Sequence, residues 1–273
     1  MAMESAGHGR PTRRMGRVSE EEGPLSYGTY LRVPELLSLQ SPLADPPAHD
    51  ETLFIIVHQV FELWFKEILF ELESARDRMF SGDARRAHHE LTRVHAIERL
   101  LVQQIEVIET MLPQDFMEFR SNLDPASGFQ SVQFREIEFL SGLKKESYLH
   151  VAETEDEKSR LQLRLTEPSL WDGFCALLES NGLPMPANDE EARRTSLIKM
   201  ARDRDAFPDL FALSEALLTH DELFAIWRSR HVLMVIRQIG SKPGTGGSSG
   251  ASYLLTTLEK RFYPDLWDIR SNL

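Results

Sequence analysis

Cysteine is almost absent from this chain of 273 residues, since Cys175 is the only one. A single thiol excludes an intrachain disulfide and any metal site built from several cysteines, and it favours a reducing compartment. Long apolar runs are missing as well. The run Leu53–Val57 is far shorter than the roughly 20 residues that a membrane helix needs. We therefore expect a cytoplasmic protein that does not enter a membrane.

Positive charge is also scarce, because 31 Lys and Arg stand against 43 Asp and Glu for a net charge of −12. A nucleic-acid partner would require a basic face, so this balance argues against one and leaves a small-molecule or protein partner open. Residues 1–25 are polar and lack the apolar core of a secretory signal. We expect a disordered N-terminal tail there, with an organellar transit peptide as the alternative, and a single domain over residues 26–273.

The alternating pattern of β-strands is not found, and no segment repeats at a fixed period. Helical periodicity dominates instead, and it predicts long helices over residues 51–81, 84–112 and 208–239, with a last helix over 253–262. The first of these is apolar nearly all round, which is typical of a helix buried in a bundle. The fold class predicted is all-α, a helical bundle in which residues 146–206 form a small accessory helical insertion.

Two histidines lie within apolar helical stretches, His58 in the first long helix and His231 in the third. No HExxH, CxxC or carboxylate spacing accompanies them, so a metal site of several side chains is poorly supported. One axial imidazole in an aromatic core would suffice for a macrocyclic cofactor. The residues leave two classes open: a haem or small-molecule enzyme, and a non-catalytic helical protein with structural histidines.

Two further features favour a closable ligand site. Arg120 stands among aromatic residues, where a guanidinium needs an anionic partner, either a structural carboxylate or that of a ligand. The loop GTGGSSG at 244–250 follows a core helix but is no phosphate loop, because no GK[ST] follows and no strand precedes it. Near the N-terminus, Tyr27, Tyr30 and Leu31 recur at helical spacing, and that pattern alone predicts packing on the chain's own core.

Four blocks in order between Ser26 and Leu254 resemble the tryptophan 2,3-dioxygenase family. They are SYGTYLRVPELLSLQ, HDETLFIIVHQVFELWFKEIL, FRSNLDPASGFQSVQFREIEFLSG and WRSRHVLMVIRQIGSKPGTGGSSGASYL. The resemblance implies a cytosolic homotetramer with one haem b per subunit, active in the ferrous form. It also implies insertion of both atoms of O2 across the indole C2=C3 bond of L-tryptophan, which gives N-formyl-L-kynurenine, the first step of the kynurenine pathway.

Matched by motif, the family's functional positions fall on thirteen residues of this sequence. His231 matches the haem ligand, and Trp227 is its neighbour one turn earlier. His58 matches the distal histidine, which hydrogen-bonds the indole N–H. The resemblance assigns the amino-acid end of the substrate to Arg120 and Thr245, the pocket wall to Phe54, Phe116 and Leu123, the loop over the distal face of the haem to Ser127 and Gly128, and the segment entering a neighbouring subunit's pocket to Tyr27, Tyr30 and Leu31.

Phe116 departs from many bacterial members, which carry a tyrosine whose hydroxyl assists the substrate carboxylate. The resemblance thus leaves one alternative open. The superfamily includes haem-dependent monooxygenases that hydroxylate tryptophan-like aromatics in secondary metabolism, and such an enzyme would keep the same motifs.

Overall fold

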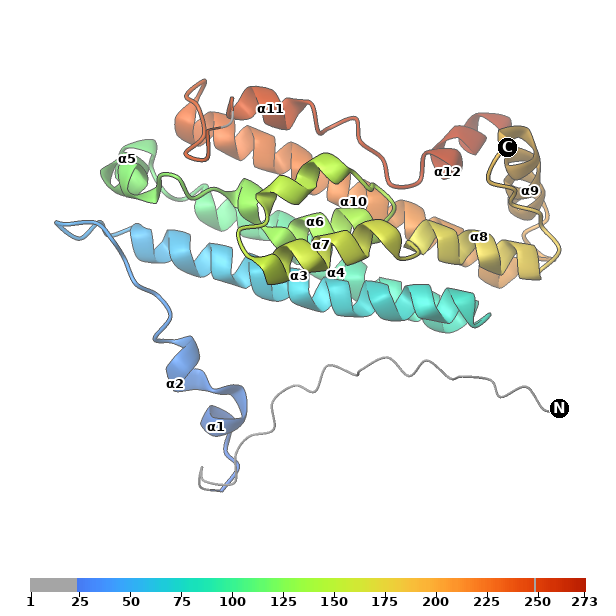
Figure 1. The fold of residues 1–273 in the computed structure, drawn as a ribbon, viewed down its shortest axis with the longest axis horizontal. Helices are drawn as coiled ribbons and strands as arrows, with labels where there is room; N and C mark the ends of the chain where they lie inside the picture. The colour runs from blue at the N-terminus through green and yellow to red at the C-terminus, as the bar shows by residue number, and fades with distance from the viewer. Residues whose placement is uncertain (1–23, 248) are drawn as a thin grey trace. The chain divides into compact units, whose positions relative to one another are not determined.

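The structure is a computed structural model and describes residues 24–247 and 249–273. These residues form helices joined by loops, and no strand is found among them, so the all-α class predicted from the sequence is confirmed (Figure 1). None of their helices combines the length and apolarity needed to cross a membrane. The polypeptide divides into two compact units, Met1–Ser41 and Pro42–Leu273. Residues 1–23 of the predicted tail lie outside the described part.

The N-terminal unit contains two short helices, α1 (Tyr27–Leu31) and α2 (Val33–Leu36). The single helix expected here is interrupted at Arg32, whose φ of 53° is left-handed and ends α1. Neither helix buries a residue. Residues 24–41 of this unit therefore provide no core on which the aromatic face could pack.

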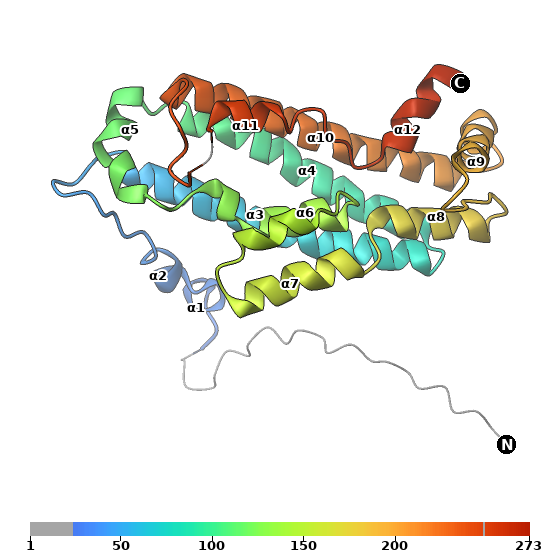
Figure 2. The same cartoon turned by 45° about the horizontal axis from the view of Figure 1, so that its top comes forward.

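Three long helices make the frame of the second unit: α3 (Glu51–Phe80), α4 (Ala84–Ile108) and α10 (Pro208–Ile239). They lie side by side in both ribbon views (Figures 1 and 2). Gly82, with φ of 85°, forms the tight turn between α3 and α4. α4 ends before the predicted Leu112, because Pro113 starts a separate helix.

Shorter helices cover this frame. α6 and α8 pack on α3, α7 packs on α6, and α11 packs on α10. The bounds of these elements are α5 (Pro113–Phe119), η1 (Arg120–Leu123), η2 (Gly128–Gln130), α6 (Val132–Leu140), η3 (Glu146–Val151), α7 (Glu155–Thr166), α8 (Leu170–Ser180), α9 (Glu190–Arg202), α11 (Ala251–Leu255), α12 (Pro264–Asp268) and η4 (Ile269–Asn272).

One apolar cluster runs through the unit and includes buried residues of α3, α4, α6, α8, α9, α10 and α12. The expectation that the apolar first half of α3 is buried in the bundle is wrong for one face of this helix. Ile56 and Leu63 of that half are exposed, as is Phe70 seven residues further on. Residues two turns apart share one side of a helix, so these three form an apolar stripe on the surface of the unit.

The predicted helix over residues 253–262 is also wrong, because α11 ends at Leu255. The buried carboxylate of Asp221 holds the end of the predicted segment, at Phe262 and Tyr263, in a non-helical conformation. Its Oδ2 accepts hydrogen bonds from the backbone N–H groups of Phe262 (3.0 Å) and Tyr263 (3.2 Å) and from the indole N–H of Trp267 (2.9 Å). These bonds satisfy backbone donors outside a helix and tie the C-terminal segment to α10.

Candidate active site

A cavity of about 770 Å³ lies inside the helical frame. Its walls come from α3, α4, α5, α6, α7, α10 and α11 and from the loops at 124–128 and 244–245. Ten of the thirteen sequence-predicted site residues line it: Phe54, His58, Phe116, Arg120, Leu123, Ser127, Gly128, Trp227, His231 and Thr245. The other three, Tyr27, Tyr30 and Leu31, belong to the N-terminal unit and are exposed there.

His58 presents a hydrogen-bond acceptor to the cavity. Its Nδ1 lies 2.7 Å from the carbonyl oxygen of Phe54, which can only accept, so Nδ1 carries the proton and Nε2 has the lone pair. Burial lowers the pKa of His58, against the opposing effects of the Phe54 carbonyl and the Glu62 carboxylate. The imidazole is therefore neutral near pH 7, in a defined tautomer.

His231 enters the same cavity from α10 and makes no hydrogen bond within the described residues. Its ring stacks on the indole of Trp227, one turn earlier, with centroids 5.1 Å apart and planes inclined by 5°. Burial, with a smaller contribution from His58, lowers the pKa of His231 to about 4. A neutral imidazole without a hydrogen-bond partner has a lone pair available for a metal ion.

Arg120 at the start of η1 pairs with no carboxylate in the part of the chain that the structure describes. Its Nη2 donates to the carbonyl oxygen of Pro243, in the loop after α10. The structural carboxylate partner that partial burial suggested is thus not found there. The remaining N–H groups of the guanidinium are available to an anionic ligand in the cavity.

The loop after α10 is joined to the loop after η1 beside Arg120. The hydroxyl of Thr245 donates to the carbonyl oxygen of Ala126 over 2.7 Å. Since its proton is used in that bond, the oxygen of Thr245 presents lone pairs that can accept from a ligand.

Aromatic rings form the apolar wall next to His58. The ring of Phe54 lies 4.1 Å from the imidazole, 5.7 Å from the ring of Phe116 and 5.6 Å from that of Phe119. On the other side, Phe61 contacts both His58 and Trp227 at centroid distances of 6.4 and 6.1 Å. A flat aromatic ligand would be held between such faces.

Sequence reasoning missed a charged wall of the cavity. Arg135 and Glu138 come from α6, and Arg228 comes from α10. Glu138 accepts from Arg135 over 2.7 Å and from Arg228 over 2.8 Å, so two cations share one carboxylate. The Nε of Arg135 and the Nε1 of Trp227 are buried and have no hydrogen-bond partner among the described residues. The signal was the charged pattern within the apolar helix VQFREIEFL.

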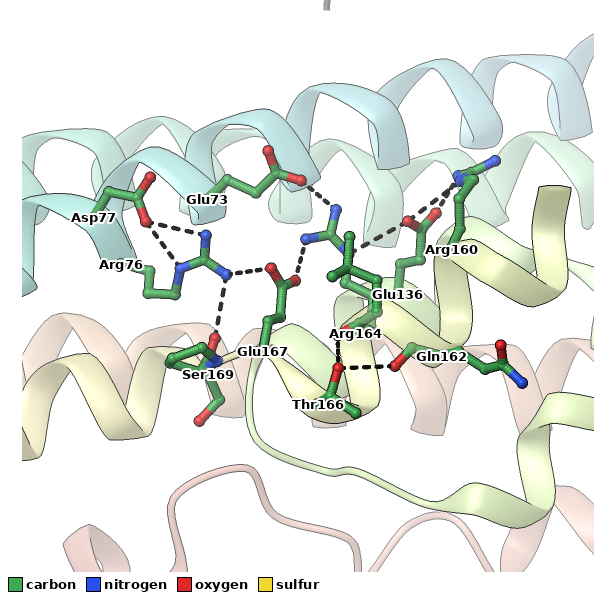
Figure 3. Close-up of polar contacts among 12 residues, drawn as sticks. Glu73, Arg76, Asp77, Glu136, Arg160, Gln162, Arg164, Thr166, Glu167 and Ser169 are labelled. Atoms are coloured by element: carbon green, nitrogen blue, oxygen red, sulfur yellow. Dashed lines mark hydrogen bonds and ion pairs between the residues drawn. The ribbon is translucent and has the colours of Figure 1, made fainter. Parts of the chain in front are cut away.

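The segment interpreted as an accessory insertion also reaches the cavity, through Glu157 and Arg160 of α7. A chain of ion pairs holds this helix (Figure 3). Arg160 and Arg164 both pair with Glu136 of α6, and Arg164 also pairs with Glu73 of α3. The chain continues through Glu167, which accepts from Arg164 over 2.5 Å and pairs with Arg76 of α3 over 3.1 Å.

The fold and the cavity define a helical protein with an interior site that combines two neutral imidazoles, aromatic walls and a guanidinium that meets no carboxylate of the described residues. Within residues 24–247 and 249–273, no three His, Cys, Asp or Glu side chains gather as a metal site would require.

The chain belongs to the tryptophan 2,3-dioxygenase family, whose sequence model matches residues 13–183 and 187–273. It is 56% identical to the tryptophan 2,3-dioxygenase of a Nocardioides species over 261 residues, which cover 93% of this chain and 97% of that one. It is 46% identical to the protein of that name from Herpetosiphon aurantiacus, with 91% and 98% covered. It is 40% identical to that of Caulobacter vibrioides with the same coverage. The resemblance seen in the four sequence blocks is confirmed.

Proposed function

We propose that this chain is a haem-dependent dioxygenase that converts L-tryptophan and O2 to N-formyl-L-kynurenine, the first step of tryptophan catabolism by the kynurenine pathway. The observation that carries the proposal is the placement of His58 and His231 in one aromatic-walled cavity, in a chain of this family. Both imidazoles have pKa values lowered by burial. His58 is hydrogen-bonded to the Phe54 carbonyl, whereas His231 has no hydrogen bond within the described residues.

The residues of the cavity fit haem b. His231 offers a neutral imidazole as the metal ligand, oriented by its stacking on Trp227. The excess positive charge of Arg135 and Arg228 over Glu138 suits the two carboxylates that haem carries, and the buried N–H groups without partners are donors for their oxygen atoms. When bound, ferrous haem supplies the site at which dioxygen is activated.

The chain's own residues position the substrate. The lone pair on Nε2 of His58 accepts the indole N–H, because Nδ1 is occupied by the Phe54 carbonyl. Phe54, Phe116 and Leu123 enclose the ring, and Phe116 contributes a ring face without a hydroxyl. The loop residues Ser127 and Gly128 line the cavity and would lie over the face of the cofactor on which the substrate binds.

Two residues hold the amino-acid end of tryptophan. Arg120 pairs with the carboxylate, for which it has N–H groups that bind none of the described residues. Thr245 accepts from the ammonium group and also contacts the carboxylate, since its own proton goes to Ala126. Holding both ends of the substrate fixes the indole C2=C3 bond in one orientation, and such orientation is a large part of catalysis.

The same proposal includes a cytoplasmic homotetramer in which the N-terminal segment reaches a neighbouring subunit. Tyr27 and Tyr30 are 79% and 67% exposed, and Leu31 is exposed as well. Large aromatic side chains in such a position favour burial against another molecule. The apolar stripe of Ile56, Leu63 and Phe70 on α3 supports subunit association in the same way.

The proposal is tested with the purified, haem-loaded protein, L-tryptophan and isotopically labelled dioxygen. Mass analysis of the product is expected to show two labelled oxygen atoms and an opened indole ring. A product with one labelled atom would instead identify the hydroxylase alternative. A preparation that takes up no haem, judged by the absence of a Soret band, would contradict both.

A further inference from the structure

We propose that Gly246 is a positioning residue of this site, because the lack of a side chain there lets the loop after α10 seat against Ser127 and so sets the reach of Thr245. The inference rests on the proposed function for the role of Thr245. The contact itself is a property of the two loops.

The contact leaves no room for a side chain at residue 246. A Cβ built on Gly246 would lie 2.4 Å from Cβ of Ser127, 3.0 Å from its Oγ and 3.6 Å from the carbonyl oxygen of Pro125. Carbon atoms of separate residues do not approach to 2.4 Å, since contact attraction is optimal near 3.5–4.0 Å. Ordinary contact at 3.4 Å would require the two loops to separate by about 1 Å.

Ser127 cannot easily turn aside to make this room. Its backbone N–H donates to the side chain of Gln130 over 2.8 Å, and its hydroxyl accepts from the N–H of Phe129 over 3.4 Å. These two bonds form the capping box of η2. The clash at residue 246 therefore has to be relieved by the glycine loop rather than by Ser127.

The displaced loop segment includes Thr245, which binds the amino-acid end of the substrate. Thr245 precedes Gly246 directly, and its hydroxyl bonds to Ala126, the residue before Ser127. Pro243, in the same loop, accepts a hydrogen bond from Arg120 of η1. A retreat of the loop by about 1 Å would move Thr245 away from the amino-acid end of tryptophan, and a misplacement of that size can cost about 100-fold in rate.

The test is a mutant cycle of Gly246→Ala, Ser127→Gly and the double variant. The matched control is Gly247→Ala, alone and with Ser127→Gly. Gly247 lies in the same loop, has φ of 74° and has no atom within 4 Å of its would-be Cβ. Because its φ is positive, Gly247→Ala strains the backbone of the loop without any contact to Ser127, so it is a loop perturbation that Ser127→Gly cannot relieve.

Two quantities are measured for each variant: hydrogen exchange of the backbone amides at 244–247 without substrate, and kcat/KM for L-tryptophan. Gly246→Ala is expected to speed the exchange and to lower kcat/KM by about 10- to 100-fold. In the Ser127→Gly background, Gly246→Ala is expected to change neither the exchange rate nor kcat/KM, because the clash is gone. Ser127→Gly is expected to leave the effect of Gly247→Ala unchanged.

The outcomes separate this inference from the proposed function. Wild-type exchange and kcat/KM in Gly246→Ala would overturn the inference. So would a loss of kcat/KM on Gly246→Ala that is the same in the wild-type and the Ser127→Gly backgrounds. If the wild-type protein does not convert tryptophan while the exchange data show the rescue, the proposed function fails and the contact between the loops stands.

Discussion

At the scale of single residues, His58 and His231 differ in what holds their rings. The Phe54 carbonyl binds one nitrogen of His58, whereas the ring of His231 stacks on Trp227 and has no hydrogen bond to any residue that the structure describes. His231→Ala is therefore expected to abolish stable haem incorporation. The measurement is the Soret absorbance per subunit after purification, with thermal unfolding as a control for folding. A variant that keeps the normal Soret band would show that His231 is not the ligand.

The protonation of His58 predicts a pH dependence with a definite sign. Because burial lowers its pKa below the usual 6.5, His58 stays neutral and accepting at neutral pH. As pH falls through the lowered pKa, Nε2 gains a proton and turns from acceptor to donor. The acid limb of the profile of kcat/KM is expected to have its midpoint below pH 6.5 and to disappear in His58→Ala. An acid limb unchanged by the substitution would assign it to another group.

Arg120 has a hydrogen bond to Pro243 but no carboxylate within the described residues, which predicts a direct effect on substrate. Arg120→Ala is expected to lower kcat/KM for L-tryptophan by about 10- to 150-fold, since a hydrogen bond to a charged group is worth roughly 1.5–3 kcal/mol. Steady-state kinetics measure this, with the haem content as a control. An unchanged kcat/KM at full haem content would remove Arg120 from the binding site.

At the scale of elements, the ion pairs around Arg164 connect α7 to α3 and α6 and so hold one wall of the cavity. Removal of Arg164 leaves the buried Glu136 and Glu167 with one cation each instead of two, so Arg164→Ala is expected to lower the free energy of unfolding by about 3 kcal/mol, the low end of the range for breaking a buried pair. The matched control is Arg85→Ala, whose exposed pair with Asp209 is worth at most about 1 kcal/mol. Urea unfolding followed by circular dichroism compares the two. Equal effects would mean that the network adds nothing beyond a surface pair.

Another buried polar group secures α10. His220 lies between Glu98 of α4 (2.6 Å to Nδ1) and Ser141 (2.9 Å to Nε2). The order Ser–His–Glu is that of a hydrolytic triad, yet His220 and Ser141 have no exposed surface and none of the three lines the cavity. The group thus joins three segments of the bundle, three helical turns before His231.

At the scale of the whole molecule, the exposed N-terminal aromatic residues predict that assembly and turnover are linked. Removal of residues through Leu31 is expected to impair subunit association and to lower kcat together. Sedimentation and steady-state kinetics measure the two effects on the same preparation. A truncated protein with full activity would contradict an N-terminal contribution to a neighbouring subunit.

The local pattern of the sequence was sufficient for much of this protein. Apolar periodicity and the residues Gly82 and Pro208 mark α3 and α10, because helix signals are short-range. The same pattern singled out His58 and His231 as histidines in apolar helices. Family resemblance added the residues of the two loops, which have no periodicity to interpret.

Contacts between residues far apart in the sequence decided the rest. Asp221 binds the backbone N–H groups of Phe262 and Tyr263 outside a helix. Because Asp221 is 41 residues before Phe262, the sequence around residue 262 gives no sign of this contact. Arg120 meets Pro243 instead of an acidic side chain, and Gly246 meets Ser127 across 119 positions of sequence (246 minus 127). Such partners come together only when the helices have packed, so the charged wall and the seating of the loop are properties of the tertiary structure.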